Sequence, residues 1–394
     1  MDISSEEPQR RDWTPVILLA LAIFVFNTTE FAPIALLSDI ATDFGITTAH
    51  AGLLVTIYAW MVALLSLPLM LACADMERRA LLRNLFLIFI ASHILSGVAG
   101  NFYVLLISRI GVACAHSVFW SINIPLALRI APKNYASRAL GILSTGSAVA
   151  MVLGLPLGRV IGLYLGWRMT FLAIGAMALV VMAALLRRLP VLPSRHAGNL
   201  HSLPGLVRRP ALIGLYVLTV LFVTGHFTGY TYIEPFVTQA AHGNENAATA
   251  VLLFFGLAGI LGCYLFARWN DRHPTAMFFL PFGLTALCLL LLLPASRSLP
   301  LLVAVCVLWG AAMAAVNLVF QSRVVRVAPD ATDIAMSMYS GIYNIGIGSG
   351  AYIGGLVTTH LGLGDVGIVA GCIAACASVW GLYCLRRFFT PSTP

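Results

Sequence analysis

The sequence predicts an all-α polytopic membrane protein with twelve transmembrane helices arranged as two six-helix bundles. Of its 394 residues, 60% are hydrophobic and only 10% are charged, whereas soluble domains carry roughly 25% charged residues. The mean hydropathy is +0.93, and apolar runs recur from one end of the chain to the other. Each run is long enough to cross a bilayer as a helix. Transmembrane strands would instead alternate apolar and polar residues in shorter segments.

The first six spans are expected at residues 14–38, 50–72, 81–100, 102–128, 139–162 and 168–187. Residues 14–187 would therefore form the N-terminal six-helix bundle. The tail before them, residues 1–13, is polar. No small-residue cleavage site follows the first apolar run, so the first span is expected to be retained rather than removed as a signal peptide.

A polar linker rich in Pro and Arg follows at residues 188–210. The second six spans are expected at residues 211–236, 246–267, 275–295, 299–321, 334–359 and 366–385. Residues 211–385 would then form the C-terminal six-helix bundle, and residues 386–394 a short tail.

The basic residues predict the orientation of these spans. Nearly all of the 23 Lys and Arg residues fall in loops on one side, and only Arg159, Arg168 and Arg297 fall toward the other. The positive-inside rule places both termini and the linker in the cytoplasm. This pattern also explains the net charge of +8 without a nucleic-acid partner. The eight cysteines show no CxxC spacing, so no metal site is expected, and no cofactor.

The two halves of the chain resemble each other. The segment "RIAPKNYASRALGIL" enters the fifth span and "RVAPDATDIAMSMYSGIY" enters the eleventh. Pro132 and Pro329 are separated by nearly the same number of residues as Asp75 and Asp271. Two repeated bundles are the layout of a transporter that rocks around a central site.

Four motifs make this expectation specific. The loop "ADMERRALLR" carries Asp75, Arg78 and Arg79, and its second copy "GCYLFARWNDRHP" keeps Asp271 and Arg272. "LLISRIGVACAH" places Arg109 within the fourth span, and "GLPLGRVIG" gives the fifth span its small residues and proline, namely Gly154, Pro156 and Gly158. These motifs resemble the major facilitator superfamily, and within it the drug:proton antiporter-like exporters. The glycine usual between the acid and the basic pair of the first motif is absent here, and Leu155 interrupts the fifth-span motif.

Longer strings resemble the bacterial sugar efflux transporters of that family, which export arabinose and thiogalactosides. They include "FNTTEF", "IYAWMVALLSLPLML", "ISRIGVACAHSVFWSI", "YTYIEPFV" and "APDATDIAM", and the resemblance covers essentially the whole chain. It implies the major facilitator fold and proton-coupled antiport of small sugars by alternating access around a central cavity. It further implies a monomer in the bacterial inner membrane, with sugar and protons as its partners.

Glu30 is the one acid far from any predicted helix end. It lies ~24 Å from the cytoplasmic end of the first span, and Arg109 lies ~30 Å from the cytoplasmic end of the fourth, at a rise of 1.5 Å per residue. An intramembrane charge is costly unless it faces a cavity or a partner. Glu30 is therefore a candidate carrier of the coupling proton, with Arg109 and His116 beside it. The alternative is a structural carboxylate hydrogen-bonded by Asn27 and Thr28.

Polar and aromatic residues form a stripe on the fourth span. Arg109, His116, Trp120 and Asn123 follow the spacing i, i+7, i+11 and i+14, which places them on one helix face. Such a face turns toward the protein interior. An aromatic ring and an amide suit a sugar, so Trp120, Asn123 and Asn27 are candidate substrate-binding residues. The alternative is polar contact between helices, and His116 alone is more often a packing residue.

The seventh and eleventh spans offer further candidates. His226, Tyr230 and Glu234 are spaced at i, i+4 and i+8 on the seventh span, and Tyr343 and Asn344 lie within the eleventh. Tyr230 could equally be an interface anchor and Glu234 an exposed interfacial acid.

The motif residues have mechanical interpretations. Small residues and a proline allow close packing and bending of the fifth span, with Gly154, Pro156 and Gly158 as the residues concerned. The loop motifs are expected to close a cytoplasmic gate by ion pairs, or else to act only as topology signals, through Asp75, Arg78, Arg79, Asp271 and Arg272.

Three other functions are weighed. A multidrug:proton antiporter would use the same fold, and so would an inward proton–sugar symporter. A membrane enzyme or receptor would need a nucleophile–base cluster or a soluble module, and neither is present, so the chain is not expected to be an enzyme. The absence of a GxxxxGK[ST] motif argues against ATP-driven transport by this chain.

Overall fold

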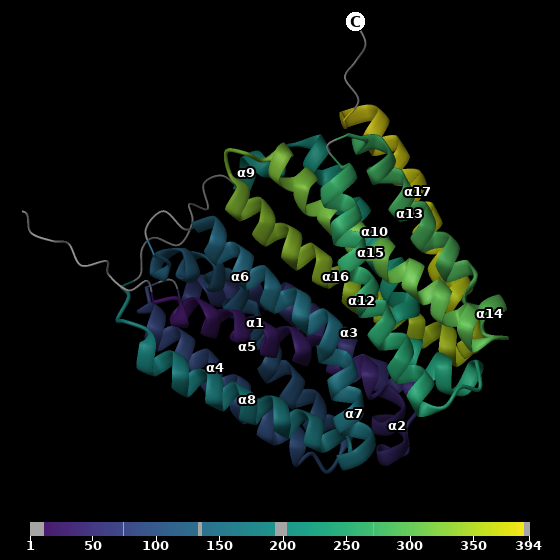
Figure 1. Ribbon diagram of the computed structural model, residues 1–394, viewed down its shortest axis with the longest axis horizontal. Coiled ribbons are helices and arrows are strands. Elements are labelled where there is room, and N and C mark those ends of the chain that lie inside the picture. Colours follow the sequence, from purple (N-terminus) through teal and green to yellow (C-terminus); the bar gives the residue numbers. More distant parts are fainter. Residues whose placement is uncertain (1–11, 74, 133–135, 194–202, 271, 390–394) are drawn as a thin grey trace, which may run out of the picture.

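The computed structural model describes residues 12–73, 75–132, 136–193, 203–270 and 272–389. Their regular structure is entirely helical, and ten helices are long and apolar enough to cross a membrane. The helices form two bundles, which Figure 1 shows in purple to teal for the first half of the chain and in green to yellow for the second. Helices predominate because a backbone in lipid must satisfy its hydrogen bonds within its own segment.

The N-terminal bundle contains seven long or joined helices and one short one. They are α1 (Thr14–Ala35), α2 (Leu37–Phe44), α3 (Thr48–Ala72), α4 (Arg78–Gly97), α5 (Phe102–Ile130), α6 (Ala136–Val149), α7 (Leu155–Leu165) and α8 (Trp167–Arg188). A π-helical turn, η1 (Ala150–Gly154), joins α6 to α7 and ends two residues before Pro156. Side-chain caps start three of these helices: Thr47 for α3, Glu77 for α4 and Asn101 for α5.

The linker contains α9 (Leu203–Leu206), and the C-terminal bundle follows. Its elements are α10 (Pro210–Tyr230), α11 (Ile233–Pro235), η3 (Phe236–Ala240), α12 (Glu245–Trp269), α13 (Pro274–Leu290), α14 (Leu292–Ala295), α15 (Leu299–Val327), α16 (Thr332–His360), η4 (Leu363–Asp365), α17 (Val366–Cys384) and η5 (Leu385–Phe389).

Corresponding helices pack in the same way in the two bundles. α1 contacts α6 and α8, and α10 contacts α16 and α17; likewise α3 contacts α5, and α12 contacts α15. This pattern agrees with the repeat predicted from the two halves of the sequence.

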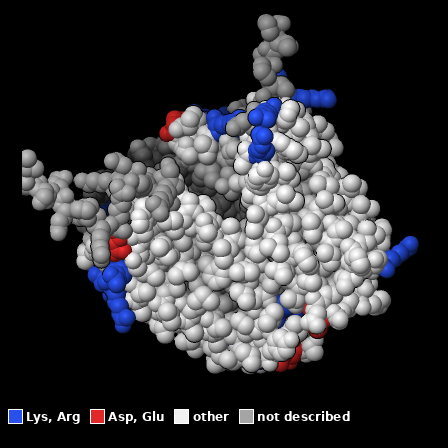
Figure 2. Space-filling model, viewed as in Figure 1, with Lys and Arg blue, Asp and Glu red and all other residues white. Residues whose placement is uncertain are grey.

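The bundles meet along two helix pairs and at one end. α3 packs on α16, α12 packs on η1 and α7, and α2 touches α11. We call the end with α2, α7 and α11 the closed end, and the end where α8 stops and α10 begins the linker end. The bundles diverge toward the linker end (Figure 1), and Figure 2 shows the surface hollowed between them there. On this face the broad middle of each bundle carries no charge (Figure 2).

The contact between α3 and α16 requires glycine. A Cβ atom added to Gly348 would lie 2.3 Å from Cδ1 of Trp60 and 2.9 Å from the backbone oxygen of Thr56. The two helices can therefore approach this closely only because Gly348 has no side chain, in the manner of small-residue interfaces between membrane helices.

Candidate functional site

The three residues nominated for proton coupling are buried inside the N-terminal bundle. Glu30 on α1 is 8% exposed, and Arg109 and His116 on α5 are 0% and 1% exposed. Because a buried charge is costly without partners, their contacts determine what they can do.

Arg109 is held by α1 through Thr29 rather than through Glu30. Its guanidinium donates to the Thr29 hydroxyl at 3.0 Å and to the Thr29 backbone oxygen at 2.9 Å. It also lies 4.5 Å from the centroid of the Tyr58 ring, a cation–π distance. Among the described residues, no carboxylate lies within 4 Å of this guanidinium. The cation therefore fixes α1 against α5 while Glu30 remains available for another partner.

The Thr29 hydroxyl also contacts His93 of α4, so it links Arg109 to a third helix. It lies 2.8 Å from Nε2 of His93, and Nδ1 of His93 lies 2.8 Å from the backbone oxygen of Phe89. A carbonyl only accepts, so Nδ1 carries the proton and Nε2 accepts from Thr29. His93 is thereby assigned as a neutral structural residue.

His116 is the partner of Glu30. Its Nε2 lies 3.6 Å from Oε2 of Glu30, and its Nδ1 lies 2.7 Å from the Tyr58 hydroxyl. The indole N–H of Trp120 also contacts Nε2. Because an indole N–H only donates, Nε2 acts as an acceptor and the imidazole is neutral, with its proton on Nδ1. An ionised Glu30 would then face the lone pair of Nε2. One added proton between the carboxylate and Nε2 would allow Glu30 and His116 to form a hydrogen bond.

The two asparagines nominated beside this cluster differ in their contacts. Asn27 donates through Nδ2 to the Ser147 hydroxyl of α6 at 3.1 Å. Asn123 is fully buried, and neither its amide nitrogen nor its oxygen has a hydrogen-bond partner among the described residues. A buried amide without partners is rare, and it marks a place where a polar ligand would be favourable.

The C-terminal bundle contains an aromatic cluster around His226. The Trp309 indole of α15 donates to Nδ1 of His226 at 3.1 Å, and the Tyr230 ring stacks on the imidazole with centroids 5.1 Å apart. Phe255 of α12 lies against Tyr230 at 4.7 Å. Trp309 is fully buried, and it was not nominated from the sequence.

Two candidates lie on α16. Asn344 donates to the backbone oxygen of Ser340 at 3.0 Å, while its own oxygen has no partner among the described residues. Tyr343 is half-buried, and its ring lies 5.8 Å from that of Tyr339. Both lie on the helix that packs against α3 of the opposite bundle.

The closed end is held by a cluster of charges around Arg159 of α7. This guanidinium is 0% exposed and donates to the backbone oxygen of Ala35 at 3.0 Å. It pairs with Asp39 of its own bundle, with Glu234 at 3.3 Å and with Glu245 of the opposite bundle. Glu234 is also 0% exposed, and its Oε2 accepts from the Ser38 backbone N–H at 3.0 Å.

The glycine motif positions this arginine. A Cβ atom added to Gly154 would lie 2.7 Å from the Thr28 hydroxyl, so this glycine allows close approach of η1 to α1. Gly158 accepts a hydrogen bond from Thr170 of α8 at its backbone oxygen. Pro156 follows the π-helical turn η1 inside the continuous helix formed by α6, η1 and α7, so it removes a backbone donor where the hydrogen-bond ladder is already irregular.

The loop motif at the linker end is organised by Glu77. Its carboxylate accepts from the backbone N–H groups of Arg79, Ala80 and Leu192. Burial raises the pKa of Glu77, but these three hydrogen bonds outweigh burial and lower it overall. Asp75 is exposed and makes no ion pair within the described part of the chain, Arg79 donates to the Leu186 backbone oxygen, and Arg78 donates to that of Cys73.

The second copy of this motif is described only in part. Asp271 lies outside the described residues, and Arg272 is exposed directly after α12. Whether the two motifs close a gate stays a prediction.

Sequence reasoning missed the residues that act across helices. Arg159 was noted only as one of the few basic residues on the far side, and Asp39, Glu245, Tyr58 and Thr29 were not nominated. One signal was available, because Arg159 lies inside the "GLPLGRVIG" motif and two acids follow the first span within a few residues.

Comparison with known proteins is consistent with this architecture. The fold is similar to that of a bacterial homologue of the human lysosomal transporter Spinster in an inward-facing, unoccupied conformation, with a TM-score of 0.78 and 17% identity over 96% of this chain and 98% of that one. It is also similar to a POT family transporter in complex with 5-aminolevulinic acid, with a TM-score of 0.76 and 12% identity over 95% and 96% of the two chains. At these identities the likeness concerns the fold alone.

A family model shows membership directly. The model of the Major Facilitator Superfamily matches residues 18–332 and again residues 264–394. The chain is a multi-pass membrane protein with a transporter fold, and it belongs to the Major Facilitator Superfamily.

Proposed function

We propose that this protein is a proton-coupled antiporter that exports small neutral sugars, such as arabinose and thiogalactosides, by alternating access. The observation that carries the proposal is the contact of one imidazole nitrogen, Nε2 of His116, with both Glu30 and Trp120. One side chain is a candidate proton carrier and the other a candidate sugar ligand. Their competition for one atom supplies a physical basis for coupling.

The topology follows the charge pattern. The ten candidate spans, together with the shorter apolar α13 and the 29-residue α16, would make twelve. The linker end would lie in the cytoplasm because the basic loops gather there. The bacterial inner membrane and a monomeric state remain part of this proposal, as implied by the family resemblance. The arrangement described here would then be open to the cytoplasm.

Glu30 and Trp120 compete for Nε2 of His116 according to whether this atom carries a proton. With His116 neutral, Nε2 accepts from the Trp120 indole and holds this ring in place. A proton on Nε2 turns that atom into a donor, which can then bind the Glu30 carboxylate but no longer the indole. Proton arrival therefore releases Trp120, and proton loss restores it. Arg109 remains with Thr29 in both states and keeps α1 and α5 aligned.

Sugar binding would use groups from both bundles. Trp120 is half-buried and offers a ring face, and Asn123 offers an unpartnered amide. Tyr343 and Asn344 would contribute from α16, and His226 with Tyr230 from α10. Of the two acids nominated from the sequence, Glu30 belongs to this central site and Glu234 pairs with Arg159 at the closed end. A single nominated acid favours neutral substrates over cationic drugs.

The test is sugar flux in sealed proteoliposomes with and without an imposed pH gradient. Wild type is compared with Glu30→Gln, which retains hydrogen bonding but cannot titrate, and with Asp365→Asn as a control acid-to-amide change in the turn before α17. We expect gradient-driven arabinose flux against the proton movement in wild type and in the control. In Glu30→Gln we expect sugar exchange to continue and gradient-driven flux to disappear.

Each other result changes the assignment. Flux of sugar together with protons would identify a symporter. Flux of amphipathic cations but not of sugars would identify a drug exporter. Unchanged gradient-driven flux in Glu30→Gln would remove Glu30 from the mechanism.

A further inference from the structure

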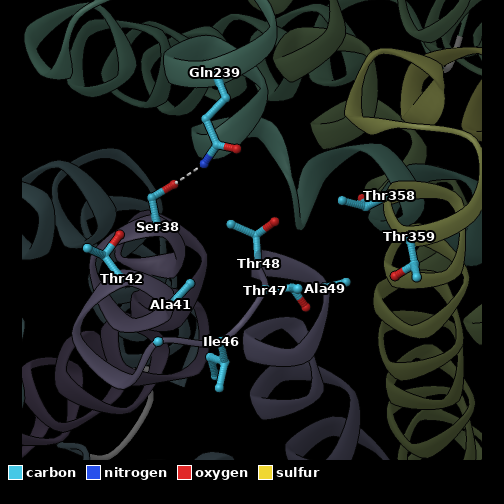
Figure 3. Close-up of a pocket in the computed structure, with 11 residues that line it drawn as sticks. Ser38, Ala41, Thr42, Ile46, Thr47, Thr48, Ala49, Gln239, Thr358 and Thr359 are labelled. Atoms are coloured by element: carbon cyan, nitrogen blue, oxygen red, sulfur yellow. Dashed lines mark hydrogen bonds between the residues drawn. The ribbon is translucent and has the colours of Figure 1, made fainter.

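A pocket of about 530 Å³ lies at the closed end between the two bundles. Eleven residues line it (Figure 3). One wall comes from α2, the turn after it and the start of α3; the other comes from η3 and the last turn of α16. Its volume lies within the range of small-molecule sites. It is separate from the proposed central site, and no role above uses it.

The lining of this pocket is rich in hydroxyl groups and has no charge. Six hydroxyl side chains and one amide face it, namely Ser38, Thr42, Thr47, Thr48, Thr358, Thr359 and Gln239. The remaining four lining residues are apolar, namely Ala41, Gly45, Ile46 and Ala49. An ionic ligand would find no counter-charge among these side chains. A neutral ligand with several hydroxyls would find many partners.

The existing hydrogen bonds leave acceptor capacity on these groups. The hydroxyls of Thr358 and Thr359 donate to backbone oxygens of their own helix at 2.8 and 2.9 Å. Their lone pairs can still accept from a ligand. The Ser38 hydroxyl already accepts from Nε2 of Gln239 at 3.2 Å, across the two bundles (Figure 3). A ligand hydroxyl could replace or extend that contact.

We propose that this pocket binds a neutral polyhydroxy compound, a sugar or polyol, and that the bound ligand holds the closed end shut. Both walls are needed for the pocket, and they come from different bundles. A ligand that binds only when the walls are together shifts the equilibrium toward that arrangement by its differential affinity. Sugar accumulating on this side would then restrain opening of the closed end.

The test is direct binding of sucrose to the protein in lipid nanodiscs, measured by saturation-transfer NMR. Wild type is compared with the variant Thr42→Val/Thr358→Val/Thr359→Val, which removes three hydroxyls with little change in shape. The matched control is Thr332→Val. The Thr332 hydroxyl donates to a backbone oxygen of its own chain in the same way, but at the other end of α16.

We expect the triple variant to weaken sucrose binding by at least about tenfold, since each hydroxyl contributes a hydrogen bond, and the control to bind like wild type. A third variant, Trp120→Ala, separates this pocket from the central site and should retain the signal. Equal binding by wild type and the triple variant would overturn the proposal, and so would loss of binding in Trp120→Ala alone. Glycerol as a second probe separates sugars from polyols in general. The readout is binding, so the result does not depend on whether transport is proton-coupled.

Discussion

Replacing Arg159 with glutamine should open the closed end of the molecule. The side chain is fully buried and pairs with Asp39 on one side and with Glu234 and Glu245 on the other. Without it, three carboxylates from two bundles face each other with no cation between them. Like charges at this separation repel, and Glu234 has no access to water.

The size of the effect can be worked from the exposure of each partner. Removing one member of a buried ion pair costs about 3–5 kcal/mol. The side chains of Asp39 and Glu245 are 31% and 51% exposed, so their contributions are screened. Taking about 3 kcal/mol for Glu234 alone, the ratio of closed to open molecules should fall roughly a hundredfold. Two conformations of a transporter differ by a few kcal/mol, so this change is sufficient to reverse the preference.

The assay is a distance measurement between spin labels on opposite sides of the closed end. Thr42 of α2 and Thr359 of α16 are exposed and belong to different bundles. Both would be replaced by cysteine after removal of the native cysteines. Double electron–electron resonance should show a longer distance in Arg159→Gln. Glu234→Gln should give a smaller shift, because Arg159 keeps two carboxylates.

Arg168→Gln is the matched control. Arg168 pairs with Asp43 at 2.8 Å, and both belong to the N-terminal bundle, so its loss should leave the distance unchanged. An identical distance distribution in wild type and Arg159→Gln would show that the charge cluster does not hold the two bundles together, and the reasoning would be wrong.

Two further predictions concern packing and pH. Gly348→Ala should lower the melting temperature by an amount equivalent to about 1–3 kcal/mol of overpacking, because its Cβ would lie 2.9 Å from the Thr56 backbone oxygen. In the control Gly341→Ala the nearest neighbour of the new Cβ would be 3.9 Å away, so this variant should be neutral or slightly stabilising. Equal melting temperatures for the two variants would contradict the proposed close approach. The hydrogen bonds that Arg209 donates to Asp330 at 2.7 and 2.6 Å lower the pKa of this carboxyl. The stabilisation of the folded state by the Arg209–Asp330 pair should therefore be complete above the unfolded pKa of about 3.9 and disappear as pH falls through the lower folded pKa. The difference in melting temperature between wild type and Asp330→Asn should shrink below about pH 4. A difference that persists in acid would show that this pair is not its cause.

The membrane helices could be predicted because composition and length determine them. α1 begins at Thr14 as expected, and α15 and α16 begin within two residues of the predicted starts. The third predicted span begins at residue 81, whereas α4 begins at Arg78, because Glu77 caps it with two backbone hydrogen bonds. α2 was not predicted as a separate helix. It is short and amphipathic, and its acids made it look like a loop between two spans.

The sequence could predict which site residues share one face of a helix, but not which residues of other helices they contact. The stripe on α5 needed only helical periodicity, and Arg109 and His116 are both buried as that periodicity predicts. The partners of these residues depend on the rotation of neighbouring helices, which the sequence does not specify. Arg109 therefore contacts Thr29 where Glu30 was the expected neighbour, and Glu30 contacts His116. In the loop motif, Asp75 was expected to form ion pairs, whereas it is Glu77 that holds the loop by accepting backbone hydrogen bonds.

α1 connects the two charged clusters. Thr28 packs against Gly154 at the π-helical turn, and the backbone oxygen of Ala35 accepts from Arg159 on α7. Glu30 lies between these two positions on the same helix. A change in protonation that alters the contact between Glu30 and His116 acts on the helix that also positions Arg159. This helix pair gives proton binding and opening of the closed end a continuous physical connection. The close approach of Thr28 to Gly154 and the hydrogen bond from Arg159 to Ala35 join α1 to η1 and to α7. A displacement of α1 at Glu30 would therefore be transmitted to the ion pairs that hold the two bundles together.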